Sequence, residues 1–332
     1  MGAQRGLSVL TDDTISSPTL RKNSEADDII YGAGGGADTR TASRDNLSPQ
    51  RFFKRSTWSR NSDHLLNAMS QHPFASVPSS VSIVSPSSTP APGKPLTDVL
   101  LEHQPYLLEL ATRAPFLVAA GTGNLPKALL SKWLSQDRLY AQAYIGFIGA
   151  LIARVDLPYA HVEDKQSSLR WRIVQMLSSS LANIHRELKF FEDVAKRYSL
   201  NLEFPPRLDV YFTADMATKQ YIDLFRAFWT DPTMTLLEGL VVLWATEYCY
   251  FKAWRYAASH LNQGRRDDLD GGALRNEFIP NWTSDEFAKF VDEITVCTNL
   301  LAEREEAGRK IEVLKEVWVH VLSIERKFWP EM

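Results

Sequence analysis

Apolar residues recur at helical spacing along most of the chain after residue 95. From Gln166 to Tyr198 they return every three or four positions, as one face of a helix requires. Similar patterns predict helices over residues 127–155, 207–229, 233–261, 284–297 and 302–328. We find no segment with the alternation of apolar and polar residues that is typical of a strand. The pattern predicts an all-α domain over residues 96–332, with about seven helices.

Local signals place several ends of these helices. Pro126 stands where a first-turn proline belongs, and Thr283 or Ser284 is a suitable cap for the helix that follows. Thr230-Asp231-Pro232 predicts a stop, because a proline cannot continue a helix. The charged run from Gly264 to Gly272 reads as a loop.

Residues 1–95 have a different composition, with a glycine-rich run at Gly32–Gly36 and a Ser/Pro/Thr tract from Ser76 to Pro95. Such a segment buries too little apolar surface to offset its ordering entropy, so we expect disorder. Basic residues precede Ser24 and Ser43, which fits either phosphorylation or chance in a Ser-rich tail. The segment Phe52–Met69 has two readings as well, a short docking helix or an unstructured stretch.

Charge and composition exclude several classes. The chain has 37 Lys and Arg against 40 Asp and Glu, so no basic field favours nucleic acid as a partner. Two cysteines, Cys249 and Cys297, without a CxxC or HExxH pattern, argue against a disulfide framework or a local zinc site. The sequence has neither an uncharged apolar run long enough for a membrane span nor an N-terminal signal core, which favours a soluble, cytoplasmic protein.

One predicted helix contains ionisable side chains in an otherwise apolar sequence. The stretch Leu236–Trp254 is apolar nearly all round, yet it contains Glu238, Glu247 and Tyr250. A buried carboxyl group is costly unless it is paired or useful, so this helix is expected to line a pocket. Glu238 and Glu247 lie two and a half turns apart and point to opposite sides, which makes Glu238 a first-turn residue that the helix dipole favours.

A second constellation lies on the helix after Pro126. Asp137, Tyr140 and Tyr144 stand at positions i, i+3 and i+7, which share one helix face. A carboxylate beside aromatic rings suits a 4-aminopyrimidine, because the carboxylate accepts from the amine and a ring stacks on the heterocycle. The alternative is a surface aspartate with core tyrosines. His185, on the helix from Gln166, has no second ligand at metal-binding spacing.

Several segments resemble one family in order along the chain. They are PFLVAAGTGNLPKALLSKWLSQDRLYAQAY, NIHRELKFFEDVAKRYSL, the stretch from Tyr221 to Tyr250, NWTSDEFAKFV and IERKFWP. Together they resemble the TenA/thiaminase-II family, whose members have the heme-oxygenase-like all-α fold. The resemblance implies substrate-binding positions at Asp137, Tyr140, Tyr221, Tyr250 and Trp282, and a catalytic glutamate at Glu325. Trp282 falls where many members have tyrosine.

The chain departs from the family's commonest pattern at one position. Many members have a nucleophilic cysteine four residues before the matched tyrosine, where this chain has Thr246. The following Glu247 resembles the branch that lacks the cysteine and uses a glutamate in the sequence WAxE. Thiamin-cleaving chemistry is therefore in doubt, and salvage hydrolysis is the nearer match.

Glu247 and Glu325 are the candidates for acid–base catalysis. Two carboxyl groups in unlike environments can divide the roles of acid and base. We assign Glu325 as proton donor and Glu247 as base, with the reverse left open. The alternatives are a buried Glu247 paired with Arg255 or Arg226, and a solvated Glu325 in the last turn.

These inferences predict a hydrolase of thiamin salvage that acts on an amino- or formylaminomethyl aminopyrimidine without a metal or cofactor. The resemblance also implies a homo-oligomer, either a tetramer or a dimer. A non-catalytic or regulatory protein that binds a flat ligand on the same scaffold is the alternative. An iron-dependent oxygenase would need a cluster of His and carboxylates that the sequence does not provide.

Overall fold

The computed structural model of this chain describes residues 93–203 and 212–332, and these lie within one compact unit, Arg51–Met332. The predicted disordered tail, the phosphorylation sites and the segment Phe52–Met69 lie outside the described residues, apart from residues 93–95. So do residues 207–211, where the third predicted helix was expected to begin.

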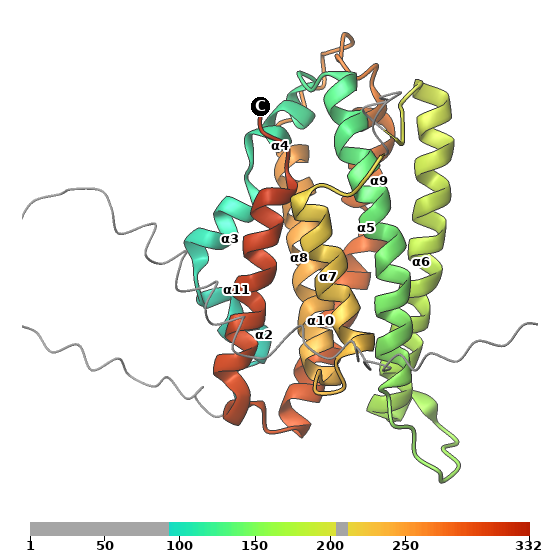
Figure 1. Cartoon of the computed structure of the whole chain (residues 1–332), viewed down its shortest axis with the longest axis vertical. Helices are drawn as coiled ribbons and strands as arrows, with labels where there is room; N and C mark the ends of the chain where they lie inside the picture. Colours follow the sequence, from blue (N-terminus) through green and yellow to red (C-terminus); the bar gives the residue numbers. More distant parts are fainter. Residues whose placement is uncertain (1–92, 204–211) are drawn as a thin grey trace, which may run out of the picture. The chain divides into compact units, whose positions relative to one another are not determined.

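The described residues form an all-α structure, as the sequence predicts, and no strand occurs among them (Figure 1). Its α-helices are α2 (Leu96–Glu102), α3 (Pro105–Thr112), α4 (Pro115–Thr122), α5 (Lys127–Ala153), α6 (Leu169–Tyr198), α7 (Met216–Thr230), α8 (Leu236–Ser259), α9 (Ile279–Trp282), α10 (Asp285–Arg304) and α11 (Ile311–Phe328). Short 3-10 turns at Lys165–Ser167 and Ala307–Lys310 and a π-helical turn at Leu274–Phe278 link them. In this part of the chain, no helix combines the length and apolarity that a bilayer crossing requires.

Helix α8 lies at the centre of the packing and contacts α3, α4, α10 and α11. Its first two turns are almost wholly buried, which its apolar sequence predicts. The helix begins with a capping box, in which Thr235 accepts from the Glu238 backbone N–H and Glu238 accepts from the Thr235 N–H at 2.8 Å. The first-turn interpretation of Glu238 is therefore confirmed, and its carboxylate takes part in the cap of the helix.

Three predicted boundaries are wrong. Residues 212–215 are not helical, because Asp215 caps α7 by accepting from the Thr218 N–H. The helix predicted from Ala302 begins only at Ile311, while α10 continues to Arg304. Apolar spacing continues across this junction without a proline, so periodicity alone did not reveal the turn, in which Glu306 adopts a left-handed backbone conformation.

A close approach of two backbones fixes α4 against α8. A Cβ added at Gly121 would lie 2.0 Å from the Ala257 carbonyl oxygen, and a backbone atom cannot move aside as a side chain can. Gly121→Ala is therefore expected to lower the free energy of unfolding by about 1–3 kcal/mol, the usual cost of overpacking. Urea unfolding measures this. Gly149→Ala is the control, because that α5 position has open space and alanine favours the helix; equal stability of the two variants would contradict the close approach.

Candidate functional site

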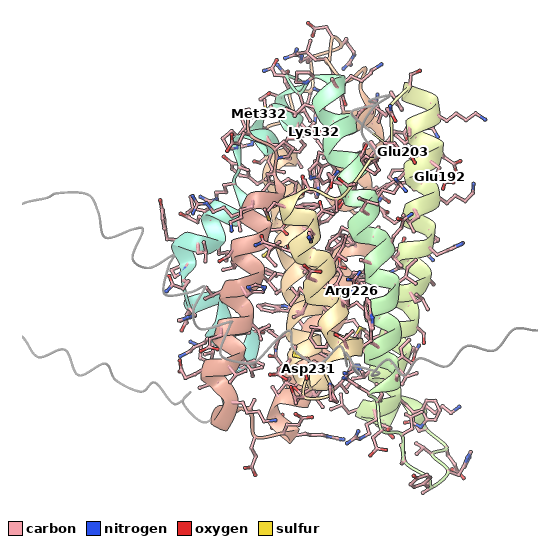
Figure 2. The ribbon with its side chains drawn as sticks, in the orientation of Figure 1. Lys132, Glu192, Glu203, Arg226, Asp231 and Met332 are labelled. Atoms are coloured by element: carbon pink, nitrogen blue, oxygen red, sulfur yellow. The ribbon has the colours of Figure 1, made fainter. Side chains whose placement is uncertain are left out.

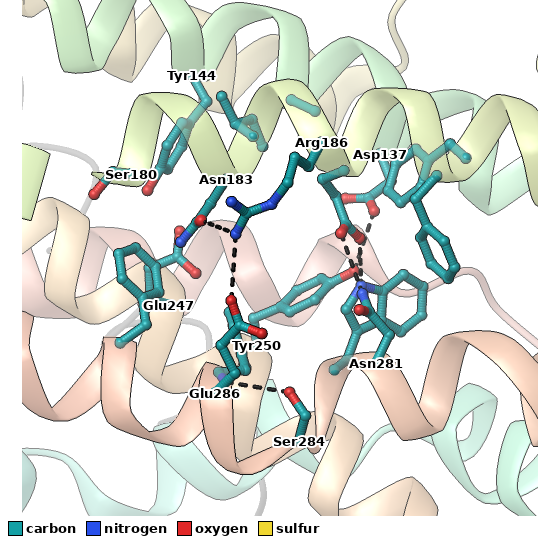
Figure 3. A pocket seen from close by; sticks show the side chains of 18 of the residues that line it. Asp137, Tyr144, Ser180, Asn183, Arg186, Glu247, Tyr250, Asn281, Ser284 and Glu286 are labelled. Atoms are coloured by element: carbon teal, nitrogen blue, oxygen red, sulfur yellow. Dashed lines mark hydrogen bonds and ion pairs between the residues drawn. The ribbon is translucent and has the colours of Figure 1, made fainter. Parts of the chain in front are cut away.

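A cavity of about 350 Å³ lies between α5, α6, α8, α9 and the first turns of α10 (Figure 3). Carbon atoms of aromatic and aliphatic side chains form most of its surface, although many of the lining residues also carry a polar or charged group. The polar and charged lining residues are Asp137, Tyr140, Tyr144, Ser180, Asn183, Arg186, Glu187, Glu247, Tyr250, Asn281, Trp282, Ser284 and Glu286. A concave site with a mainly apolar surface and convergent polar groups is the usual form of a small-molecule site.

The cavity brings together five of the residues predicted from the sequence: Asp137, Tyr140, Glu247, Tyr250 and Trp282. They come from α5, α8 and α9, so the bundle joins positions that lie far apart in the chain. The other two predicted residues, Tyr221 and Glu325, are not among those that line it. Tyr221 lies directly behind the wall, because its ring packs edge-on against that of Tyr140, with the two ring centroids 5.0 Å apart.

Asp137 is buried and is held by the Tyr250 hydroxyl, which donates to Oδ2 at 3.2 Å. Burial raises the pKa of Asp137 well above its ordinary value, and the charge of Glu187 raises it further. A carboxyl group with a raised pKa holds a proton more readily, so it can offer both an O–H donor and a carbonyl acceptor. On one edge of an aminopyrimidine, the ring nitrogen can accept from this O–H and the exocyclic amine can donate to this carbonyl oxygen.

Glu247 lines the opposite part of the cavity, near Tyr144 (Figure 3). Burial raises the pKa of Glu247 to about 7, against the opposing effect of a hydrogen bond from Tyr144. Neither arginine considered as a partner is close to it: Arg255 lies over the Phe251 ring at 5.5 Å, and Arg226 is exposed. A carboxyl group with a pKa near 7 can both accept and donate a proton at neutral pH, which acid–base catalysis requires.

Glu325 is buried rather than solvated, with 4% of its surface exposed. The Tyr221 hydroxyl donates to Oε2, while Oε1 is buried without a hydrogen-bond partner among the described residues. Burial raises the pKa of Glu325 to about 7, and the charge of Glu247 adds to the shift while the Tyr221 bond opposes it. Glu325 is thus linked to the cavity wall through Tyr221 and Tyr140.

Glu187 is a further carboxyl group in the cavity, and the sequence did not predict it as a site residue. Its Oε1 accepts from the Trp282 indole N–H at 2.5 Å, and its Oε2 accepts from the Asn281 amide at 3.2 Å. Asn183 and Glu187 are four residues apart on α6 and both line the cavity, a spacing that was available in NIHRELKFF. Polar residues at this spacing are also typical of the solvent-exposed face of an amphipathic helix, so the spacing alone does not identify a site.

The rim of the cavity carries the charged pair Arg186 and Glu286, which are both exposed and lie 3.3 Å apart across α6 and α10. Arg172 and Glu293 connect the same two helices further along, with two contacts of 2.6 and 2.7 Å. Within residues 93–203 and 212–332, no group of three or more His, Cys, Asp or Glu side chains is placed to hold a metal ion.

Comparison with known proteins identifies the family. Residues 102–332 match the TENA/THI-4/PQQC family, so this chain belongs to it. A TenA homologue from Pyrococcus furiosus has the same fold, with a TM-score of 0.56 and 22% identity over 70% of this chain and 98% of that one. At this identity the structural likeness supports the fold alone.

Two further relatives have descriptions of different kinds. A Fusarium pseudograminearum protein described as a "Probable transcription factor" is 30% identical over 279 residues, which span 73% of this chain and 52% of that protein. This chain therefore corresponds to about half the length of the Fusarium protein. A Glycine max protein described as a "Probable bifunctional TENA-E protein" is 21% identical over 236 residues, or 70% of this chain and 91% of the soybean protein.

Proposed function

We propose that this protein is a cytoplasmic hydrolase of thiamin-pyrimidine degradation products, an amino- or formylaminomethyl aminopyrimidine. The observation that carries the proposal is the meeting of Asp137 and Glu247 in one aromatic cavity with Tyr140, Tyr250 and Trp282. Membership of the TENA/THI-4/PQQC family supports it, as does the TENA-E description of the soybean relative.

In the proposed complex, Asp137 holds the amine edge of the pyrimidine and the aromatic side chains contact its faces. The substituent on the ring then lies toward Glu247. For an aminomethyl substrate, the oxygen of water bonds to the exocyclic methylene carbon as the C–N bond breaks, and the nitrogen leaves as ammonia. For a formylaminomethyl substrate, water adds to the formyl carbon, and formate and the amine are the products.

Both reactions need one group to take a proton from water, and an uncharged leaving nitrogen also needs a second group that gives it a proton. Of the two acid–base candidates, Glu247 and Glu325, only Glu247 is among the residues that line the cavity, so we place it at the reacting bond. Glu325 acts from behind the wall, where its bond with Tyr221 connects it to Tyr140. In this mechanism carboxyl groups make the proton transfers and no metal is required. Assembly as a tetramer or dimer remains a prediction.

A regulatory ligand-binding protein is the second candidate, and the description of the Fusarium relative favours it. One experiment separates the two. The full chain is incubated with each pyrimidine while ammonia and formate release are measured, and its melting temperature is followed in parallel. Product formation supports the hydrolase. A rise in melting temperature without product supports the binding protein, and the absence of both effects rejects both functions for these ligands.

A further inference from the structure

The carboxyl group of Glu187 is not explained by the indole that it contacts. An indole N–H is a donor only. Trp282 is packed among aromatic rings, and its ring centroid lies 4.3 Å from that of Trp254 and 4.8 Å from that of Phe278. Yet Trp133 and Trp244 are equally buried, and their indole N–H groups have no acceptor among the described residues. The fold therefore tolerates an unpaired indole N–H. A neutral acceptor such as glutamine would satisfy Trp282 without the cost of burying a carboxylate, and the exposed Asn281 amide, which donates to the other oxygen of Glu187, can bond to water instead.

The charges around Glu187 also lack compensation inside the cavity. Asp137 and Glu247 line the same cavity, and the charge of Glu187 raises the pKa of both. Arg186 is the one cationic side chain among the described lining residues, and it is exposed at the rim beside Glu286. As far as the described residues show, the interior therefore holds three carboxyl groups and no lysine, arginine or histidine. A ligand that carries positive charge would supply the missing countercharge.

We propose that Glu187 is a positioning and specificity residue, which holds Trp282 as the end wall of the cavity and makes the pocket prefer a cationic ligand. The cation is an ammonium group or a protonated heterocycle. The choice of ligand rests on the proposed function, since an aminomethyl pyrimidine carries an ammonium group whereas its hydroxymethyl counterpart does not.

Glu187→Gln separates the two roles of this residue. Glutamine keeps an oxygen that accepts from the Trp282 N–H, so the wall is expected to stay in place while the charge is lost. Glu192→Gln is the matched control, because Glu192 lies on the same helix and is exposed on its outer side (Figure 2). A second variant, Glu187→Leu, removes the acceptor as well and is expected to weaken the binding of every ligand.

Calorimetry at pH 7.5 with the aminomethyl and hydroxymethyl pyrimidines tests the preference. The wild type is expected to bind the cationic ligand more tightly by about tenfold or more, the value of one charge-assisted hydrogen bond. Glu187→Gln should abolish that preference and leave the affinity for the neutral ligand within about twofold, while Glu192→Gln behaves as the wild type. Unchanged preference in Glu187→Gln, or an equal loss for both ligands, overturns the proposal.

The same comparison with benzylammonium and benzyl alcohol keeps this test independent of the proposed function. If neither pyrimidine binds the wild type, the proposed function fails. A preference for benzylammonium that disappears in Glu187→Gln would still support the role of Glu187. Absence of any preference in the wild type for both pairs of ligands overturns that role.

Discussion

Glu247→Gln is expected to lower kcat by about 10²–10⁴-fold, the range found for removal of a general acid or base. The substitution keeps the size of the side chain and an acceptor for Tyr144, but it removes the group that exchanges protons. KM is expected to change little, because Asp137 and the aromatic wall remain in place. Steady-state measurements of ammonia release give both constants.

Glu238→Gln is the control for this prediction. It makes the same change on the same helix, at a capping residue on the far side of α8, and should leave kcat unaltered. Retention of turnover in Glu247→Gln would remove this residue from the mechanism. The pH profile of kcat/KM, which reports the pKa values of the free enzyme, then assigns its role: as a base, Glu247 must be ionised, so kcat/KM rises with pH through about 7, whereas as an acid it must be protonated, so kcat/KM falls there.

The helical architecture was predictable because burial imposes a period on the sequence. The capping box at Thr235 and the cap at Ser284 can also be recognised in the sequence, because each is formed by residues three positions apart. The end of α10 was not predictable in this way, because buried Leu301, Ala302 and Ala307 continue the apolar spacing through the turn. Periodicity reports which residues are buried, and it does not report where the chain reverses.

The candidate site shows a similar division. Asp137 and Tyr140 share a helix face, so their proximity follows from sequence spacing, and Glu247 was conspicuous in an apolar helix. The pairing of Tyr221 with Glu325 joins residues 104 positions apart, and that of Trp282 with Glu187 joins residues 95 apart. Such contacts depend on how α6, α7 and α11 pack. The resemblance marked Glu325 as functional, but it did not show that the carboxyl group lies behind the wall.

The pH dependence of stability offers a test of Glu325 that does not involve a substrate. The pKa of Glu325 rises from its ordinary value of 4.5 to about 7 in the folded protein. Between these values the folded state keeps a proton that the unfolded state releases, so the free energy of unfolding falls as pH rises from about 4.5 to 7. The shift corresponds to a loss of about 3 kcal/mol above pH 7, and the loss is absent below pH 4.5.

Glu325→Gln is therefore expected to be more stable than the wild type at pH 8, by up to about 3 kcal/mol, and to have little such advantage at pH 4. Urea unfolding at the two pH values measures the difference. Glu316→Gln, on the exposed side of α11, should follow the wild type at both. An unchanged pH slope in Glu325→Gln would contradict the burial of an unpaired carboxyl oxygen. A glutamate that weakens the fold at neutral pH, where glutamine would strengthen it, indicates a site kept for chemistry rather than for stability.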